Sequence, residues 1–220
     1  MKEKIADFFW PPIRANRANR VIRARREQQS GQVLWSEVHK QVQSSLTKYK
    51  ELSANLEAAS ELTKSETSRK DTLEGKASII VQSAGIAVSI VALAPAVLGK
   101  QWSLSFWWTG IVLFLYFLAI IHLLVAVTYA IRARRVAEYA MPTTTGLIGL
   151  MKDSSTHSFA KNLIAQKISD TRWNEDSLIM KVNELSVAED MFLRGLAFFA
   201  GSVSIVILRT ASVYLEQHVA

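Results

Sequence analysis

Two apolar runs decide the fold: ASIIVQSAGIAVSIVALAPAVL from Ala77 to Leu98, and LSFWWTGIVLFLYFLAIIHLLVAVTYAI from Leu104 to Ile131. A helix rises about 1.5 Å per residue, so about 20 apolar residues cross a hydrocarbon core of ~30 Å. Both runs are long enough to do so, and only residues 99–103 separate them. The pair predicts a transmembrane helical hairpin.

A third apolar run extends from Met191 to Leu208 and is interrupted only by Arg194. With about 18 residues it is marginal for a span, and Arg194 would have to reach the inner interface through its long aliphatic stem. We expect a third membrane helix here rather than a buried cytoplasmic one. The predicted fold class is an all-α membrane protein, with a transmembrane hairpin, a third membrane helix and long cytoplasmic helices.

Basic residues flank the hairpin where it enters and leaves the membrane, whereas the turn between the spans holds only Lys100. Lys and Arg beside a span stay in the cytoplasm, so the amino terminus and residues 132–190 are expected on the cytoplasmic side of the cell inner membrane. Tryptophans gather near the turn and predict an outer aromatic belt. The predicted membrane-interface residues are Lys76, Trp102, Trp107, Trp108, Arg132, Arg134, Arg135 and Arg194.

A helical region without breakers precedes the first span. From Gln32 to Lys70 there is no proline or glycine, and apolar residues recur with a period near 3.5, as in helical hairpins and coiled coils. The stripe either packs on the chain's own 158–189 segment or mediates self-association. Its members are Val38, Val42, Leu46, Tyr49, Leu52, Leu56 and Ala59.

Composition divides the chain into five parts. Two short amphipathic cytoplasmic helices are expected within 158–189, with a joint at Ser169-Asp170, and the helix before the first span is expected to continue into that span. The predicted parts are a basic and aromatic segment at 1–31, a coiled-coil-like cytoplasmic region at 32–75, the hairpin at 76–135, cytoplasmic helices at 136–190, and the third membrane helix with a tail at 191–220.

The first part contains the arginine-rich run RANRANRVIRARR. Such a segment binds anionic lipid or a phosphorylated ligand through its guanidinium groups, or it is simply a solvated charge run. Nucleic acid is not expected, because no aromatic residues interleave the arginines. Upstream, Trp10 precedes Pro11-Pro12 and predicts an interfacial anchor or an aromatic plug on the cytoplasmic helices. The candidate phosphate or lipid ligands are Arg14, Arg17, Arg20, Arg23, Arg25 and Arg26.

Small and polar residues recur along one face of the first span at intervals of three and four, and the third span has a similar face. In lipid, small residues allow close helix contact, and polar side chains hydrogen-bond across helices. The face either packs within one chain or meets copies of itself and lines a water-filled path. The residues of this helix-packing or pore face are Ser78, Gln82, Gly85, Ser89 and Gly201.

Catalytic chemistry is not expected. The absence of cysteine excludes disulfides, thiolate catalysis and Cys-ligated metals, and no histidine pair has the spacing of a helical metal site. His122 is the one histidine in the hairpin, and no carboxylate lies in either span, so we expect an inter-helix hydrogen bond rather than a proton relay. The sequence predicts a non-enzymatic protein without cofactors.

The run DTLEGKASII from Asp71 to Ile80 leads into a glycine-bearing span, a brief turn and a longer span that ends in basic residues. Asn174, Lys181 and Glu184 then precede another apolar helix. This arrangement, over Asp71–Leu208, resembles bacterial membrane effectors of the SLATT and Pycsar type. The resemblance implies an effector that oligomerises on a cytoplasmic signal and disrupts or depolarises the inner membrane in anti-phage defence.

The resemblance does not account for residues 1–70. An alternative function is therefore a non-catalytic membrane-anchored adaptor, which recruits a partner through its basic and coiled-coil amino-terminal region. The expected partners are membrane lipid, further copies of the chain, and a nucleotide second messenger or a signalling protein.

Overall fold

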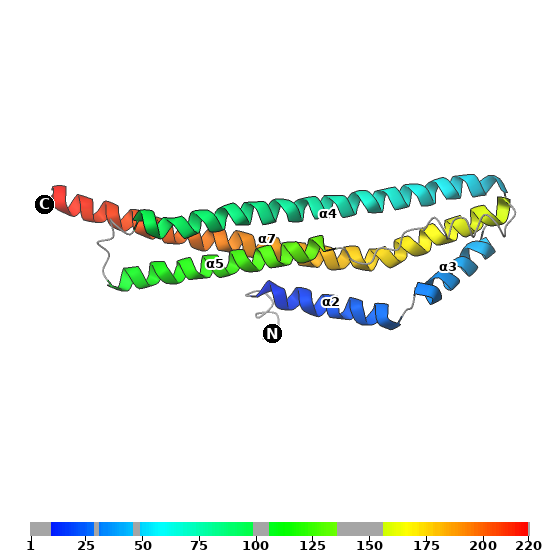
Figure 1. Cartoon of the computed structure of the whole chain (residues 1–220), viewed down its shortest axis with the longest axis horizontal. Helices are drawn as coiled ribbons and strands as arrows, with labels where there is room; N and C mark the ends of the chain where they lie inside the picture. Colours follow the sequence, from blue (N-terminus) through cyan, green and yellow to red (C-terminus); the bar gives the residue numbers. More distant parts are fainter. Residues whose placement is uncertain (1–9, 29–30, 46–48, 99–105, 136–155, 220) are drawn as a thin grey trace. The chain divides into compact units, whose positions relative to one another are not determined.

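The computed structural model describes residues 10–28, 31–45, 49–98, 106–135 and 156–219, and they contain no strand. Three of the helices, α4, α5 and α7, are long and apolar enough to cross a membrane. The predicted all-α membrane fold is thereby confirmed. The helices are α2 (Pro11–Gln28), α3 (Gly31–Ser45), α4 (Tyr49–Leu98), α5 (Phe106–Arg134) and α7 (Thr156–Val219) (Figure 1).

Local sequence explains the helix ends that the structure describes. Pro11 opens α2, where its missing N–H and fixed φ suit a first helical position. Arg132 and Arg134 occupy the last turn of α5, where cations complement the exposed carbonyls. α4 passes through Gly75 without a break, so the expected continuity between the cytoplasmic helix and the first span is confirmed.

The expected division of 158–189 into two helices is wrong, because α7 is one helix of 64 residues. No glycine or proline lies between Thr156 and Arg194, so the sequence holds no breaker. At the expected joint, Ser169 Oγ donates a hydrogen bond to the Gln166 carbonyl (3.0 Å) inside the helix. Its hydroxyl is therefore satisfied within the helix.

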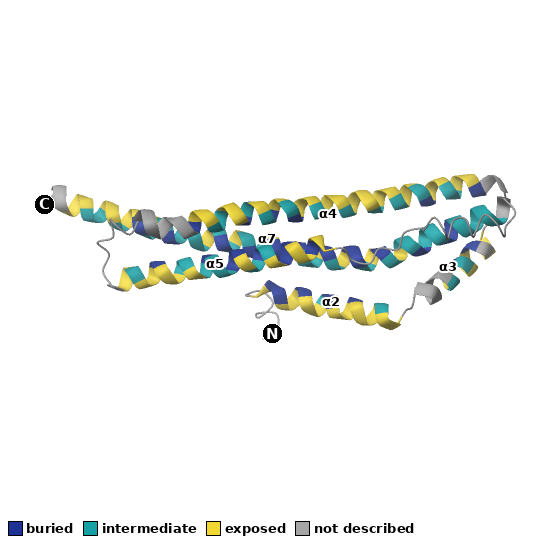
Figure 2. Ribbon diagram, viewed as in Figure 1, coloured by how far each residue is buried: buried dark blue, intermediate teal, exposed yellow. Residues whose placement is uncertain are grey.

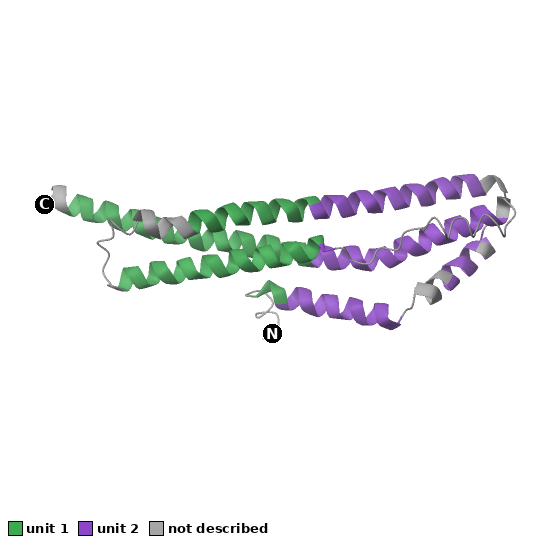
Figure 3. Ribbon diagram, in the orientation of Figure 1, with its two compact units in different colours: residues 1–12, 75–134, 184–220 green, residues 13–74, 135–183 purple. Residues whose placement is uncertain are grey.

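The chain forms two compact units, shown in different colours in Figure 3. Unit 1 consists of residues 1–12, 75–134 and 184–220, and unit 2 consists of residues 13–74 and 135–183. α4 and α7 each contribute residues to both units.

The apolar core of unit 2 joins α3, α4 and α7. Val38 and Val42 from α3 are buried together with Leu52 and Ala59 from α4, and with Ile164 and Ala165 from α7. The apolar stripe of the 32–70 region therefore packs within one chain, as one of the two alternatives predicted. Leu46 lies outside the described residues.

The core of unit 1 is built mostly from small side chains, which allow its helices to approach closely. One face of each helix is buried and the other faces outward (Figure 2). The buried residues include Ala77, Ala84 and Val91 of α4, Val112, Ala119, Leu123 and Ala126 of α5, and Met191, Ser202 and Val206 of α7.

Candidate functional site

In unit 1, the small and polar face of the first span is turned away from the helix contacts. Gln82, Gly85 and Ser89 are exposed and Ser78 is half-buried, whereas Ala84 on the opposite side is fully buried. Gln82, Gly85 and Ser89 therefore do not form the helix contact within one chain, which was one of the two alternatives for this face. The face is available to a second molecule.

The close helix contact of unit 1 is made at Gly195, which sequence reasoning missed. A Cβ atom added there would lie 2.8 Å from Leu123 Cγ and 3.3 Å from the Ala119 carbonyl oxygen, whereas nothing lies within 4 Å of a Cβ added at Gly85 or Gly201. Only glycine therefore lets α7 approach α5 this closely. The available signal was Gly195 itself, a glycine inside an apolar run.

His122 is buried in α5, and its hydrogen bond differs from the expected one. Nδ1 lies 2.8 Å from the Leu118 carbonyl of the same helix. The contacts to other segments are aromatic: the ring centroid lies 5.0 Å from that of Phe198 and 5.8 Å from that of Trp10. Trp10 thus packs on α5, a contact that neither interpretation of the amino-terminal segment anticipated.

The predicted interface residues are largely at the surface of unit 1. Trp107 and Trp108 are exposed near the start of α5, and Arg132 lies over the Tyr129 ring at 5.1 Å. Arg194 is half-buried. Trp102 lies outside the described residues, and the exposed remainder are Lys76 and Arg134 of unit 1 and Arg135, the first residue of the second segment of unit 2.

In unit 2, α4 and α7 run parallel and exchange polar contacts. Ala59 shares a core with Ile164 and Ala165, and further along both helices Glu74 accepts a hydrogen bond from Lys181. In this ion pair (2.5 Å) the Lys181 side chain is only 4% exposed, whereas the Glu74 side chain is 32% exposed. Sequence reasoning missed the pair, because local spacing does not reveal contacts between residues 107 positions apart.

Further polar side chains are buried around this pair. Asn183 donates a hydrogen bond to Asn19 of α2 (2.9 Å), and Ser177 is completely buried with no hydrogen-bond partner for its Oγ within the part of the chain that the structure describes. Unit 2 therefore has a polar layer beside its apolar core.

Two carboxyl groups in unit 2 have raised pKa values. Burial raises the pKa of Asp170 to about 6, against the opposing effect of Lys167. Burial also raises the pKa of Glu66, and nearby Glu175 and Asp170 raise it further, whereas the neighbouring polar side chains of Thr171 and Asn174 lower it. Both groups favour the protonated form more than free side chains do.

The arginine-rich run forms α2. Five of its six arginines are exposed, and the sixth contacts α7. Arg14, Arg20, Arg23 and Arg25 are exposed, as is Arg17. Arg26 instead stacks on Trp173 at 4.3 Å, and its Nη2 donates a hydrogen bond to the Trp173 carbonyl (3.2 Å). Arg26 is half-buried and thus also contributes to the fold of unit 2.

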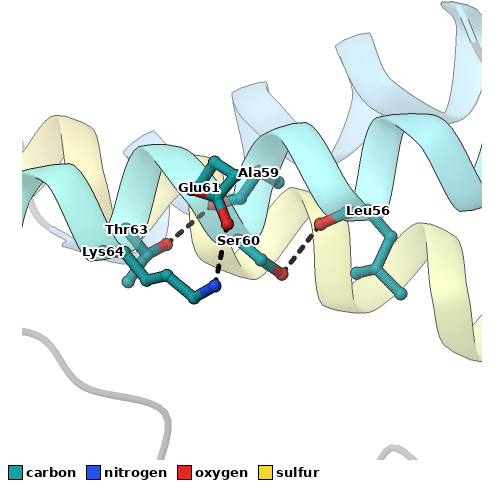
Figure 4. Close-up of polar contacts among 6 residues, drawn as sticks. All are labelled: Leu56, Ala59, Ser60, Glu61, Thr63 and Lys64. Carbon is teal, nitrogen blue, oxygen red and sulfur yellow. Dashed lines mark hydrogen bonds and ion pairs between the residues drawn. The ribbon is translucent and has the colours of Figure 1, made fainter.

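A hydroxyl-lined groove of about 880 Å³ follows α4. Ser60 and Thr63 donate hydrogen bonds to the carbonyls of Leu56 (2.8 Å) and Ala59 (2.9 Å), as Figure 4 shows. In the same way, the Thr67 hydroxyl donates to the Thr63 carbonyl and the Thr72 hydroxyl donates to the Ser68 carbonyl. These hydroxyl oxygens therefore present acceptor lone pairs outward, which gives the groove a polar surface. The lining is completed by Lys64, Ser68, Asp71 and Lys167.

A second groove of about 590 Å³ lies between α3, α4 and α7 in unit 2. Val38 and Val42 from α3 and Ile164 from α7 form part of its floor and belong to the core of the unit. Arg172 is the one charged side chain among the described residues that line it. The other polar lining residues are Gln41, Ser45 and Asn55.

No cluster of three or more potential metal-ligating side chains occurs in the described ranges. Comparison with protein-family models, with curated proteins and with solved structures finds no match.

Proposed function

We propose that this chain is a membrane effector of the SLATT and Pycsar type, which associates with further copies of itself on a cytoplasmic signal and then disrupts or depolarises a bacterial inner membrane. One observation carries the proposal. Gln82 lies inside the apolar run of α4, on a face that the rest of the described chain leaves uncovered.

An amide surrounded by hydrocarbon is unfavourable unless it is hydrogen-bonded. The described residues offer Gln82 no such bond, whereas Ser89 on the same face donates its own to the Gly85 carbonyl (2.9 Å). Gly85 leaves room for a neighbouring backbone, because nothing lies within 4 Å of a Cβ added there. A second copy that packed on this face would supply Gln82 with an amide partner.

The charge of Arg194 on α7 also supports the proposal that the membrane is breached. Gly195 packs on Leu123, which precedes Arg132 by nine residues, so Arg194 lies about 13 Å from the basic end of α5 along the helix. Glu189 and Asp190 precede Arg194 by five and four residues and lie nearer the basic end of α5. A charge such as that of Arg194 alongside an apolar helix at this depth is costly in a sealed bilayer and is typical of ion pathways.

The signal would be received on the cytoplasmic side. α4 is one helix from Tyr49 to Leu98, so residues of the unit 2 grooves and Gln82 belong to the same helix. A ligand or partner that binds unit 2, such as a nucleotide second messenger, would therefore act on a helix that also carries the proposed contact face.

The test is dye release from liposomes that contain the purified chain at increasing protein-to-lipid ratios. Association predicts that release rises more steeply than the first power of protein density. Gln82→Leu should reduce release at least tenfold and should remove crosslinked oligomers, because the amide contact is lost. Ile86→Leu is the matched control, since Ile86 is also exposed on α4 but apolar.

A chain that stays monomeric in lipid and releases no dye at any density would contradict the proposal, as would equal release by wild type and Gln82→Leu.

A second candidate, the adaptor, is favoured by the exposed arginines of α2. It predicts binding to vesicles of anionic lipid, or to a partner protein, without dye release. The same liposomes therefore distinguish the two functions.

A further inference from the structure

The groove between α3, α4 and α7 has the dimensions of a small-molecule site. Its volume of about 590 Å³ falls within the roughly 300–1,000 Å³ that such sites occupy. It exists because α4 presents the small residues Ala58 and Ala59 between Asn55 and Leu62, where larger side chains would fill the space.

The lining selects an aliphatic ligand body. Beside the alanines, the described apolar lining residues are Val38, Val42, Leu62, Ile164 and Ile168. No aromatic side chain is among them, so the groove offers a planar ring system no stacking surface. Flexible alkyl chains need no such surface and gain by leaving water for branched aliphatic side chains.

The rim selects an anionic head. Arg172 is exposed, lies one helical turn beyond Ile168 on α7, and carries the one charge among the described lining residues. A guanidinium group matches a carboxylate with two parallel hydrogen bonds. Gln41 and Asn55 add amide donors, and both are neutral, so the lining favours a single negative charge.

We propose that this groove binds a free aliphatic carboxylate of medium chain length. The carboxylate pairs with Arg172, and the alkyl chain lies along Ile168, Ile164 and Leu62. The site is independent of the proposed membrane activity, because ligand occupancy requires neither self-association nor permeabilisation.

The experiment uses the full chain in nanodiscs of zwitterionic lipid and measures binding by calorimetry, with empty nanodiscs as the blank for partition into lipid. Decanoate is the probe. Decyltrimethylammonium has the same chain with a positive head, acetate has the head without the chain, and decyl phosphate represents a lipid-type phosphate head. We expect saturable decanoate binding that exceeds binding of each other probe at least tenfold.

Two variants test the two parts of the site. Arg172→Gln should weaken decanoate binding at least tenfold, and Arg69→Gln, which changes an exposed arginine outside the groove, should leave it unchanged. Ala58→Leu should abolish binding by filling the groove. Ala58 is exposed, so this variant is expected to fold, and Ala54→Leu is its control on the same helix outside the groove.

Circular dichroism melting establishes that each variant is folded. The proposal is overturned if decanoate shows no saturable binding above the blank, if the cationic probe binds equally well, or if decyl phosphate binds in preference. It is also overturned if folded Arg172→Gln and Ala58→Leu bind like wild type. Dye release by these variants is recorded separately, so that failure of the ligand site is distinguishable from failure of the membrane effector.

Discussion

Unit 2 buries polar side chains between its helices, whereas the first span in unit 1 turns its polar face outward. In unit 2, Lys181 and Ser177 are at most 3% exposed, and Lys181 has its partner in Glu74. In unit 1, Gln82 is exposed and the contacts are made by residues such as Ala84 and Gly195. Whether an outward-facing polar side chain needs a protein partner therefore depends on whether water or hydrocarbon surrounds it.

In water an exposed amide is satisfied by solvent, and only a buried polar group needs a protein partner. In hydrocarbon an outward-facing polar group has no water to hydrogen-bond with, so it is the group that needs a protein partner.

Glu74→Gln should destabilise unit 2 by about 3 kcal/mol, because it removes the carboxylate that pairs with the buried Lys181 ammonium group. The free energy of unfolding is measured by urea denaturation in mild detergent, followed by circular dichroism. The double variant Glu74→Leu/Lys181→Met should recover most of the loss. Glu61→Gln breaks the exposed Glu61–Lys64 pair and should have no measurable effect (Figure 4). Equal effects of Glu74→Gln and Glu61→Gln would show that Lys181 is hydrated.

Gly195→Ala should destabilise unit 1 by about 1–3 kcal/mol, because the added Cβ overpacks the contact with Leu123 and the fixed Ala119 carbonyl. Gly85→Ala has open space and should leave the unfolding midpoint of the monomer unchanged. Thermal unfolding in detergent compares the two. If both variants unfold like wild type, Gly195 is not at the helix contact.

Arg26→Gln should destabilise unit 2 by about 1–2 kcal/mol, since it removes the cation–π contact and weakens the hydrogen bond to Trp173. Arg25→Gln is the control, because Arg25 is exposed on the same helix. Unfolding followed by tryptophan fluorescence measures the difference. A similar loss in both variants would mean that net charge, rather than the Trp173 contact, matters.

Asp170→Asn should change the pH dependence of stability. The folded pKa of about 6 lies above the ordinary value of 3.8, so the folded state binds the proton more tightly. The contribution of this group to stability is present below about pH 4 and is lost as the pH rises through 6. Unfolding midpoints between pH 4 and 7 should fall less steeply in Asp170→Asn than in wild type and in the exposed control Glu37→Gln. Identical slopes would place Asp170 in water.

Residues with a local signal were predicted well from the sequence. The spans followed from the length of apolar runs, and the structure confirms helices there, with α5 at Phe106–Arg134 against the expected 104–131. The seam of the 32–70 region followed from its period, and the buried Val38, Val42 and Leu52 confirm packing within the chain.

Contacts between distant segments were not predictable in this way. The period of a helix indicates which face is buried but not which helix covers it, so the pairing of Glu74 with Lys181 and of Arg26 with Trp173 was missed. The small-residue pattern likewise favoured Gly85 and Gly201 over Gly195, because spacing alone does not show which glycine lies at a helix contact. The groove lined by Arg172 depends on three helices and has no local signal.

The pairing of α2 with α7 also has a consequence for biogenesis. Arg26 and Trp173 are 147 residues apart, and synthesis at about 5–20 residues per second separates them by about 7–30 s. During that interval the hairpin is already leaving the ribosome, while the apolar stripe around Val38 and Leu52 has no α7 to cover it. The newborn chain therefore passes through a stage in which this stripe is uncovered, and unit 2 is completed only after translation of α7.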